Sequence, residues 1–415
     1  MTDQEIVELG PAFATELASY RSCFLQQRTA RHFGTYCRGL LSDLPRKSVE
    51  PIALAAGTAV RTLQEFLTTS AWDHEQARNI LQQRLAAFVA EQPEDPLGTI
   101  GVIDETSAVK KGDQTPGVQR QYLGCVGKID NGIVTVHVSV ARGTFQALLD
   151  ADLYLPQSWT QDHARCQDAG IPDDLRYRAK WRIALDQLVR LHENGIRFDW
   201  LVFDEGYGSK VPFLWVLGLL GQKFVAEVPV NFMVREQPDD PAVRADRHQP
   251  GTDVAGWHRF HIVRKTLADQ VWRARRVRVW AARRWHSLVT AVNETTGEVK
   301  FFATNAVEER LDRIVAVAFR RATIEHSFRL AKGEAGMTHF EGRDYTGLMR
   351  HMIQTLIVMG FVAVHTERLR GEKSGGDCGT GLSGFERPLR GNAASPPGSS
   401  GDSAHQPSDP VSSAA

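Results

Sequence analysis

Two short apolar runs that each end on an acidic pair constrain this chain more than any other feature. GVIDE ends at Asp104 and Glu105, and LVFDE ends at Asp204 and Glu205. Each run has the length and apolar content of a buried strand. The carboxyl ends of neighbouring strands in an α/β sheet are where polar residues converge into a site. Acids at strand ends are also common as helix caps, so the pattern alone leaves both interpretations open.

The segments around these runs predict the rest of a sheet. Residues 119–142 read as two strands around an Asn131-Gly132 turn, a dipeptide typical of hairpins. A helix over 177–195 then precedes the strand that ends at Asp204. A second helix over 211–221 and a strand over 223–229 follow it. This succession predicts a mixed α/β sheet with helices on its faces.

The segments that flank this predicted sheet differ from it in residue spacing and composition. Residues 1–97 show helical spacing, with Thr69 or Ser70 as a helix cap. Their many arginines suit either a solvated surface or a DNA-binding domain. We expect a catalytic core over 98–227 and 306–372, interrupted by a β-rich insertion over 228–305. Residues 373–415 are rich in Gly, Ser and Pro, which predicts a disordered tail.

A third acid lies on a predicted helix within RATIEHSFRLAKG. At about 100° per residue, Arg321, Glu325 and Lys332 fall within about 40° of one another. Ile324, Phe328 and Ala331 occupy the neighbouring stripe, which we expect to be the core face. Glu325 therefore lies at the border between the buried and open faces. The alternative is an ordinary ion pair between Arg321 and Glu325 on the helix surface.

Three carboxylates together would suit metal-assisted phosphoryl transfer. Mg²⁺ prefers hard oxygen ligands and keeps several waters, so two or three acids and a substrate phosphate complete its coordination. Two such ions about 4 Å apart can assist the attacking and the leaving oxygen of an in-line displacement.

Composition excludes several other classes. The 49 basic and 49 acidic residues cancel, and the five cysteines form no CxxC or Cys/His cluster. The N-terminus lacks the layout of a signal peptide. The apolar stretch at 211–221 is shorter than the roughly 20 residues that a membrane span needs. P-loop and GxSxG motifs are missing from the sequence, and a carboxylate-pair glycosidase has no support beyond acids on strands.

Five blocks in order resemble the bacterial DDE transposases of the insertion-sequence 701 family, which is allied to the insertion-sequence 4 group. The resemblance covers roughly residues 20–368, and the sequences of the blocks are VIDETSAVKKG, GVQRQYLGCVGKIDN, DLYLPQSW, FDEGYG and RATIEHSFRLAKGEAGMTHFEGRDYTGLMRHM. The resemblance implies an RNase H-like core whose catalytic acids lie on the first strand, the fourth strand and a late helix. Carried over by position, these are Asp104, Asp204 and Glu325, the expected ligands of two Mg²⁺ or Mn²⁺ ions.

The related group's tyrosine–arginine–glutamate–lysine signature places Arg321 and Lys332 near DNA phosphates. Its tyrosine position falls on Ala318, a departure that weakens the signature but leaves the three acids in place. Glu105, next to Asp104, should point to the other side of its strand and act as a structural acid.

Further DNA contacts are expected from two clusters of basic residues. Lys110 and Lys111 follow the first acid pair and are either phosphate contacts or ordinary turn lysines. In VWRARRVRVW, a strand would place Arg276, Arg278 and Trp280 on one face. Arginines can neutralise phosphates and tryptophan can stack on an unpaired base. The alternative is a solvated strand with core tryptophans.

The resemblance implies a cytoplasmic, nucleoid-associated enzyme with no membrane partner. It would cleave and join double-stranded DNA at the ends of its own mobile element, as a dimer that processes two ends and a target together. The rival hypotheses are a nuclease of the same fold that does not transpose, and a decayed relative that only binds DNA.

Overall fold

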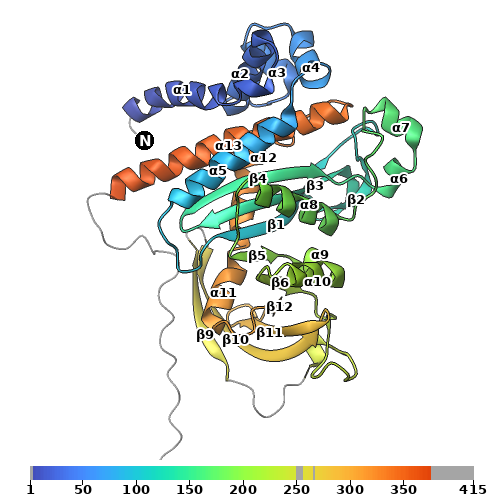
Figure 1. Ribbon diagram of the computed structural model, residues 1–415, viewed down its shortest axis with the longest axis vertical. Helices are drawn as coiled ribbons and strands as arrows, with labels where there is room; N and C mark the ends of the chain where they lie inside the picture. The colour runs from blue at the N-terminus through green and yellow to red at the C-terminus, as the bar shows by residue number, and fades with distance from the viewer. Residues whose placement is uncertain (1–2, 249–255, 265–266, 375–415) are drawn as a thin grey trace, which may run out of the picture.

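The computed structural model describes residues 3–248, 256–264 and 267–374, which form helices above and around one large sheet (Figure 1). The predicted tail over 373–415 lies outside the described residues from 375 onward. Mixed α/β architecture with helices on both faces of the sheet confirms the predicted fold class.

The N-terminal segment is helical, as predicted. Its helices are α1 (Asp3–Ala18), α2 (Gln27–Leu41), α3 (Val49–Ala55), α4 (Val60–Thr68) and α5 (His74–Glu91). The predicted cap at Thr69 or Ser70 is wrong, because Asp73 caps α5: its side chain accepts a hydrogen bond of 2.8 Å from the Gln76 amide. A carboxylate one residue before the helix reaches the free amides of the first turn, whereas residues 69 and 70 lie too far upstream.

The core sheet contains β1 (Ile100–Val109), β2 (Gln119–Leu123), β3 (Lys128–Arg142), β4 (Phe145–Leu153), β5 (Trp200–Phe203) and β6 (Phe224–Val228). β1, β5 and β6 are parallel neighbours, whereas β3 runs antiparallel to β1 and pairs with β2 and β4. The order β4-β3-β1-β5-β6 surrounds β1 with strands on both sides. The first acid-bearing strand is thus central.

The predicted turn at Asn131-Gly132 is wrong, because both residues lie within β3. The chain turns earlier, between Leu123 and Lys128. A Cβ on Gly132 would come within 2.4 Å of the Ala108 carbonyl oxygen, so this glycine serves close strand approach and not a turn. The sequence analysis also missed β4, whose two internal aspartates obscure its apolar alternation.

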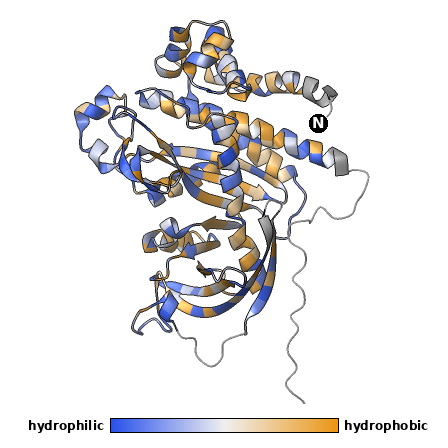
Figure 2. Ribbon diagram, turned by 180° about the vertical axis from the view of Figure 1, so that it is seen from behind, coloured by the Kyte–Doolittle hydropathy of each residue, from blue (hydrophilic) through white to orange (hydrophobic). Residues whose placement is uncertain are grey.

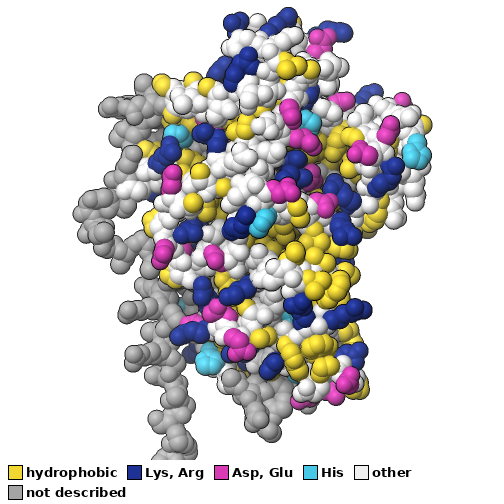
Figure 3. All heavy atoms as spheres, viewed as in Figure 1, with side chains coloured by type: hydrophobic (Ala, Val, Ile, Leu, Met, Phe, Trp, Pro, Cys, Tyr) yellow, Lys and Arg dark blue, Asp and Glu magenta, His cyan; other side chains and the backbone are white. Residues whose placement is uncertain are grey.

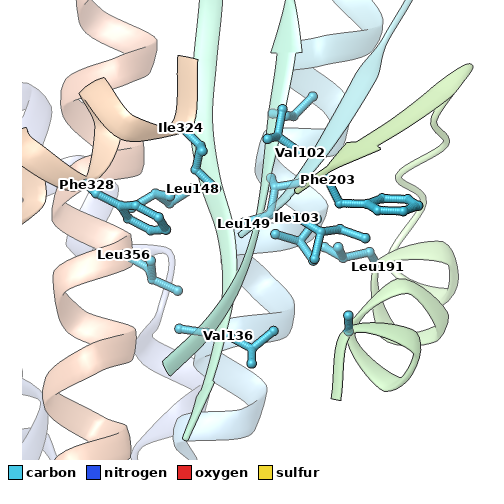
Figure 4. Packing of buried hydrophobic residues seen from close by; sticks show 14 of the residues in the cluster. Val102, Ile103, Val136, Leu148, Leu149, Leu191, Phe203, Ile324, Phe328 and Leu356 are labelled. Carbon is cyan, nitrogen blue, oxygen red and sulfur yellow. The ribbon is translucent and has the colours of Figure 1, made fainter. Parts of the chain in front are cut away.

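Helices cover both faces of the core sheet. α12 (Ala322–Gly333) and α13 (Tyr345–Ser374) pack on one face, and α8 (Lys180–Glu193) packs on the other (Figure 4). Figure 4 shows Ile324 and Phe328 of α12 facing the strands, and with Ala331 they are buried, which confirms the predicted core face of this helix.

α13 lies between the N-terminal helices and the sheet, in contact with α2, α4, α5 and β4 (Figure 1). Its segment Tyr345–Gly371 is long and apolar enough to cross a membrane, by length and composition only. However, 83% of its apolar window is buried inside the protein. A core helix satisfies the same criterion, so this segment is accounted for by its packing.

The β-rich insertion continues the core sheet. β12 (Val299–Thr304) pairs with β6, and β11 (Arg284–Asn293), β10 (Leu267–Ala281) and β9 (His258–Arg264) follow outward. Polar and apolar residues alternate along these curved strands (Figure 2). β7 (Met233–Val234) and β8 (Val243–Arg244) form a separate small sheet.

α9 (Glu205–Gly208), α10 (Val211–Leu219) and α11 (Leu311–Phe319) lie beside β5 and β6, whereas α6 (Gln157–Thr160) and α7 (His163–Asp168) follow β4. The Trp159 indole of α6 donates to the Val118 carbonyl, just before β2. α10 buries Phe213, Leu214 and Leu217 and exposes Trp215 and Leu219. Apolar side chains gather on this side of the surface, where Lys and Arg are interspersed with Asp and Glu (Figure 3).

Candidate active site

Three acids lie in one row where β5 ends between its parallel neighbours β1 and β6. The prediction that the first strand ends at Asp104 is wrong, because β1 continues to Val109 through its pairing with β3. Ile103 of β1 is opposite Phe203 of β5, and Phe203 is opposite Ala226 of β6. The next residue on each strand is an acid: Asp104, Asp204 and Glu227. The edge of the sheet therefore places three carboxylates at adjacent positions, two of which the sequence analysis had singled out.

Asp104 is buried in the central strand. Its Oδ1 accepts a hydrogen bond from the Glu105 amide at 2.7 Å, and its Oδ2 accepts one from Arg321 Nη1 at 3.1 Å. Burial and repulsion by the Asp204 carboxylate raise the pKa of Asp104 to about 7, although the Arg321 charge acts in the opposite direction. The two aspartates are therefore close enough to repel each other.

Asp204 ends β5 and caps α9. Its Oδ1 accepts hydrogen bonds from the amides of Gly206 at 2.9 Å and Tyr207 at 3.4 Å. These backbone donors fix the carboxylate at the sheet edge. The helix-cap interpretation of this acid and the catalytic one are thus compatible. Tyr207 itself is buried, and in the described part of the chain its hydroxyl has no hydrogen-bond partner.

Glu325 lies on α12 at the open border of the site. Its side chain is 60% exposed, and its Oε1 lies 3.6 Å from Arg321 Nη2. Asp104 and Glu325 contact the same guanidinium group, so their nearest carboxylate oxygens are at most about 9 Å apart. Within the described residues, no three His, Cys, Asp or Glu side chains converge into a metal-binding group. The three acids remain a predicted triad, with Asp104 and Asp204 paired and Glu325 beside them.

The paired aspartates fit a hard divalent cation. They offer carboxylate oxygens, and their mutual repulsion is the kind of strain that a bound cation relieves. Burial and that repulsion together raise the pKa of Asp104. Glu325 is exposed where it contacts Arg321, so its side chain can rotate toward the two aspartates without breaking a buried interaction.

Arg321 is the centre of the charge network. Besides Asp104 and Glu325, it contacts Glu227, with 3.6 Å between Arg321 Nε and Glu227 Oε2. Lys332, at the end of α12, is half-buried, and burial lowers the pKa of its ammonium group while the Cys125 thiol and Asp104 oppose that shift. The predicted phosphate-binding pair thus lies on the helix that faces the aspartates.

The two lysines after β1 differ in environment. The Lys110 ammonium donates to the Phe340 carbonyl at 2.5 Å, in the segment that follows α12. Lys111 is exposed. Glu105 points away from the row, as expected, and forms an ion pair of 2.7 Å with Lys180 of α8.

The arginines of the insertion divide into two kinds. Arg276 donates to the Glu309 carbonyl, which ties β10 to the segment before α11. Arg278 is exposed, and its guanidinium carbon lies 4.4 Å from the centroid of the Trp285 ring. Trp280 meets Trp285 edge to face at 5.5 Å between centroids. Both arginines and Trp280 remain predicted DNA contacts, with Arg278 the more accessible.

Glu227 is the site residue that the sequence analysis missed. Its signal was visible, since the strand KFVAEVP carries an acid near its carboxyl end as GVIDE and LVFDE do. The strand itself was predicted, but its acid was not singled out because Val228 and Pro229 follow it, so the apolar run does not stop there. At the tyrosine position of the related signature, Ala318 is buried in α11.

The fold and the acid row define the class of this protein. Residues 20–291 match the family described as DDE superfamily endonuclease, and the chain belongs to that family. The matched range contains Asp104 and Asp204 and ends before Glu325.

A more particular similarity lies within that class. Over 223 residues the chain is 34% identical to the probable transposase for insertion sequence element IS701 of Microchaete diplosiphon. The alignment covers 53% of this chain and 54% of that relative. The predicted resemblance to the insertion-sequence 701 family is thereby confirmed, and the chain matches about half the length of this relative.

Proposed function

We propose that the chain is a transposase that cleaves and joins DNA at the ends of an insertion sequence. The observation that carries the proposal is the placement of Asp104 and Asp204 side by side on the parallel neighbours β1 and β5, with Arg321 between Asp104 and Glu325. Membership of the DDE endonuclease family and similarity to a probable transposase support it.

Each acid has a proposed role in the reaction. Asp104 and Asp204, with Glu325, hold two Mg²⁺ or Mn²⁺ ions, which supply Lewis-acid stabilisation of the phosphoryl group when bound. Asp204 is oriented by backbone amides and Asp104 by the Glu105 amide, so neither carboxylate must reorganise to bind. Arg321 and Lys332 bind the phosphates on the two sides of the scissile bond.

Two displacements complete the proposed reaction. Water attacks the phosphorus at each element end, the bond to the 3′-oxygen breaks, and that oxygen leaves as a free hydroxyl. The hydroxyl then attacks a target phosphate, forms a new phosphodiester bond and releases the target's own 3′-oxygen. The attacking hydroxyl gives its proton to solvent, and the released target oxygen takes up a proton. We propose that a homodimer holds the two ends and that the enzyme acts in the cytoplasm on nucleoid DNA.

A decayed copy that only binds DNA is the second candidate. Ala318 favours it, because a buried methyl group stands where the related signature has a tyrosine. A cleavage assay separates the two candidates.

The test uses a supercoiled plasmid that carries both ends of the element, with the full chain and Mg²⁺. We expect cleavage by the wild type and loss of cleavage in Asp104→Ala, Asp204→Ala and Glu325→Ala. Glu193→Ala, at an exposed acid of α8, is the matched control and should cleave normally. Wild-type binding without cleavage would support the decayed copy, and a variant of the three that cleaves normally would remove that acid from the triad. Cleavage without joined products would support the non-transposing nuclease.

A further inference from the structure

Glu227, next to Asp204 in the acid row, contacts the Nε edge of Arg321, the arginine proposed to bind phosphate. We propose that Glu227 is a positioning residue that orients Arg321 toward the DNA phosphate. The inference rests on the proposed function, since it assigns Arg321 a phosphate to bind.

The contacts place Glu227 between two cations. Its Oε1 lies 2.6 Å from Lys300 Nζ, and its Oε2 lies 3.6 Å from Arg321 Nε. Each carboxylate oxygen thus has its own partner. Arg321 Nη1 and Nη2 instead face Asp104 and Glu325. Engaging Nε leaves the paired Nη groups on the side of the acids, where a phosphate near the metal site would lie.

The backbone beneath Glu227 is unusually constrained. β6 pairs with β5 on one side and with β12 on the other, where Glu227 is opposite Phe302. α9 packs so closely that a Cβ on Gly208 would fall 1.9 Å from the Glu227 carbonyl oxygen. The side chain is only 13% exposed. A carboxylate with so little freedom can hold a long arginine side chain in one rotamer.

The neighbouring charges favour positioning over metal ligation. Lys300 and Arg321 both contact the Glu227 carboxylate, so a divalent cation there would have to displace one of them. Asp104 has one such cation, and Asp204 Oδ1 accepts hydrogen bonds from backbone amides. Asp104 and Asp204 are therefore assigned to cation binding, and Glu227 to the positioning of Arg321.

Removal of the charge from Glu227 should lower the rate of DNA cleavage and leave the affinity for metal unchanged. In Glu227→Gln we expect the cleavage rate constant to fall about tenfold, because a misplaced arginine stabilises the transition state poorly. The affinity for Mn²⁺ alone, measured by calorimetry without DNA, should stay within about twofold of the wild type. Asp204→Asn should lose that affinity.

If Glu227 had a merely structural role, the effect of Glu227→Gln on cleavage would not depend on Arg321. This dependence is therefore the property to measure. Lysine lacks the Nε edge, so in an Arg321→Lys background the Glu227→Gln change should cause no further loss of cleavage. Glu298→Gln is the matched control: Glu298 also contacts Lys300, at 3.5 Å, but not Arg321, and its variant should cleave as the wild type does. Thermal melting of every variant detects a general loss of folding.

The outcomes are separable. A tenfold loss that vanishes in the Arg321→Lys background supports the inference. Wild-type cleavage by Glu227→Gln, an additive loss in the two backgrounds, or a loss of Mn²⁺ affinity like that of Asp204→Asn would each overturn it. A wild-type chain that fails to cleave would instead contradict the proposed function.

Discussion

The acid row and the polar cluster at α13, which consists of Arg350 and His351, both contain buried polar side chains, yet the partners of these side chains differ in kind. In the acid row, carboxylates outnumber the cations beside them, and burial and repulsion raise the pKa of Asp104 to about 7. At α13, Arg350 donates to the carbonyls of Leu67 at 3.0 Å and Trp72 at 2.9 Å, and lies over the Trp72 ring. His351 lies between the Tyr36 hydroxyl and the Gly336 carbonyl.

This difference distinguishes a group of residues that serves function from one that stabilises the fold. Charges that repel one another lower the stability of the fold and favour the binding of a cation. This is the pattern expected of a catalytic site. Charged and polar groups that meet neutral backbone partners lock elements together. The α13 cluster ties α4, the start of α5 and α2 to the helix that covers the sheet. The predictions below test this contrast.

The largest expected effect is on activity. Asp104→Asn should reduce the cleavage rate by about a thousandfold, since several kcal/mol of transition-state stabilisation depend on the metal site. Its melting temperature in EDTA should be equal to or higher than that of the wild type. A clear drop in the melting temperature of a variant that still folds would mean that Asp104 stabilises the fold. The acid row would then not differ from the α13 cluster.

The α13 cluster should show the reverse pattern. Arg350→Met should lower the free energy of unfolding by about 3 kcal/mol, because buried carbonyls lose a charged donor. The cleavage rate per folded molecule should not change. Arg61→Met, at an exposed arginine paired only with Glu65, is the control and should shift stability by less than about 0.5 kcal/mol. Urea unfolding measures both variants.

The two regions should also respond to pH with opposite signs. The raised pKa of Asp104 means that its cost is present above about pH 7 and is relieved as the pH falls toward 4. Burial lowers the pKa of His351 to about 4, so its neutral form stabilises the fold above about pH 6.5, and this contribution is lost as the pH falls toward 4.

Unfolding free energies in EDTA at pH 8 and pH 5 check the signs. Asp104→Asn should gain on the order of 2 kcal/mol over the wild type at pH 8, and much less at pH 5. His351→Gln should be destabilised most at pH 8 and less at pH 5. Parallel pH profiles for the two variants would contradict the assignment.

The smallest expected effect concerns the insertion, where the same contrast separates two arginines. Arg278 rests on an aromatic face and can bind phosphate, so Arg278→Ala should weaken DNA binding by about 1 kcal/mol and lower the salt slope by about one. Arg276 already donates to the Glu309 carbonyl, so Arg276→Ala should lower the slope by less than Arg278→Ala does and should lower stability as well. Fluorescence anisotropy from 50 to 200 mM salt, a range in which phosphate contacts dominate, measures both slopes.

Local patterns in the sequence were sufficient for many elements. Apolar runs that end at Asp104 and Asp204 predicted two central strands, and the spacing of Ile324, Phe328 and Ala331 predicted the buried face of α12. These local patterns failed where the same residues are compatible with two different local structures. Asn131-Gly132 looked like a turn, but the pairing of β3 with β1 and β2 keeps it extended, and the aspartates of β4 are held by Arg190 in the interior.

By itself the sequence determined most of the strands and helices and two of the three acids in the row, because those properties depend on neighbours a few residues away. It did not reveal β4, the full length of β1 or Glu227 as a member of the row. Only the tertiary structure decided that β6 lies beside β5 in a register that aligns Glu227 with Asp204, and that Arg321 reaches across from α12 to Asp104 and Glu227. Sheet register and helix docking depend on contacts between residues far apart in the chain, 217 positions for Arg321 and Asp104, and no local periodicity encodes them.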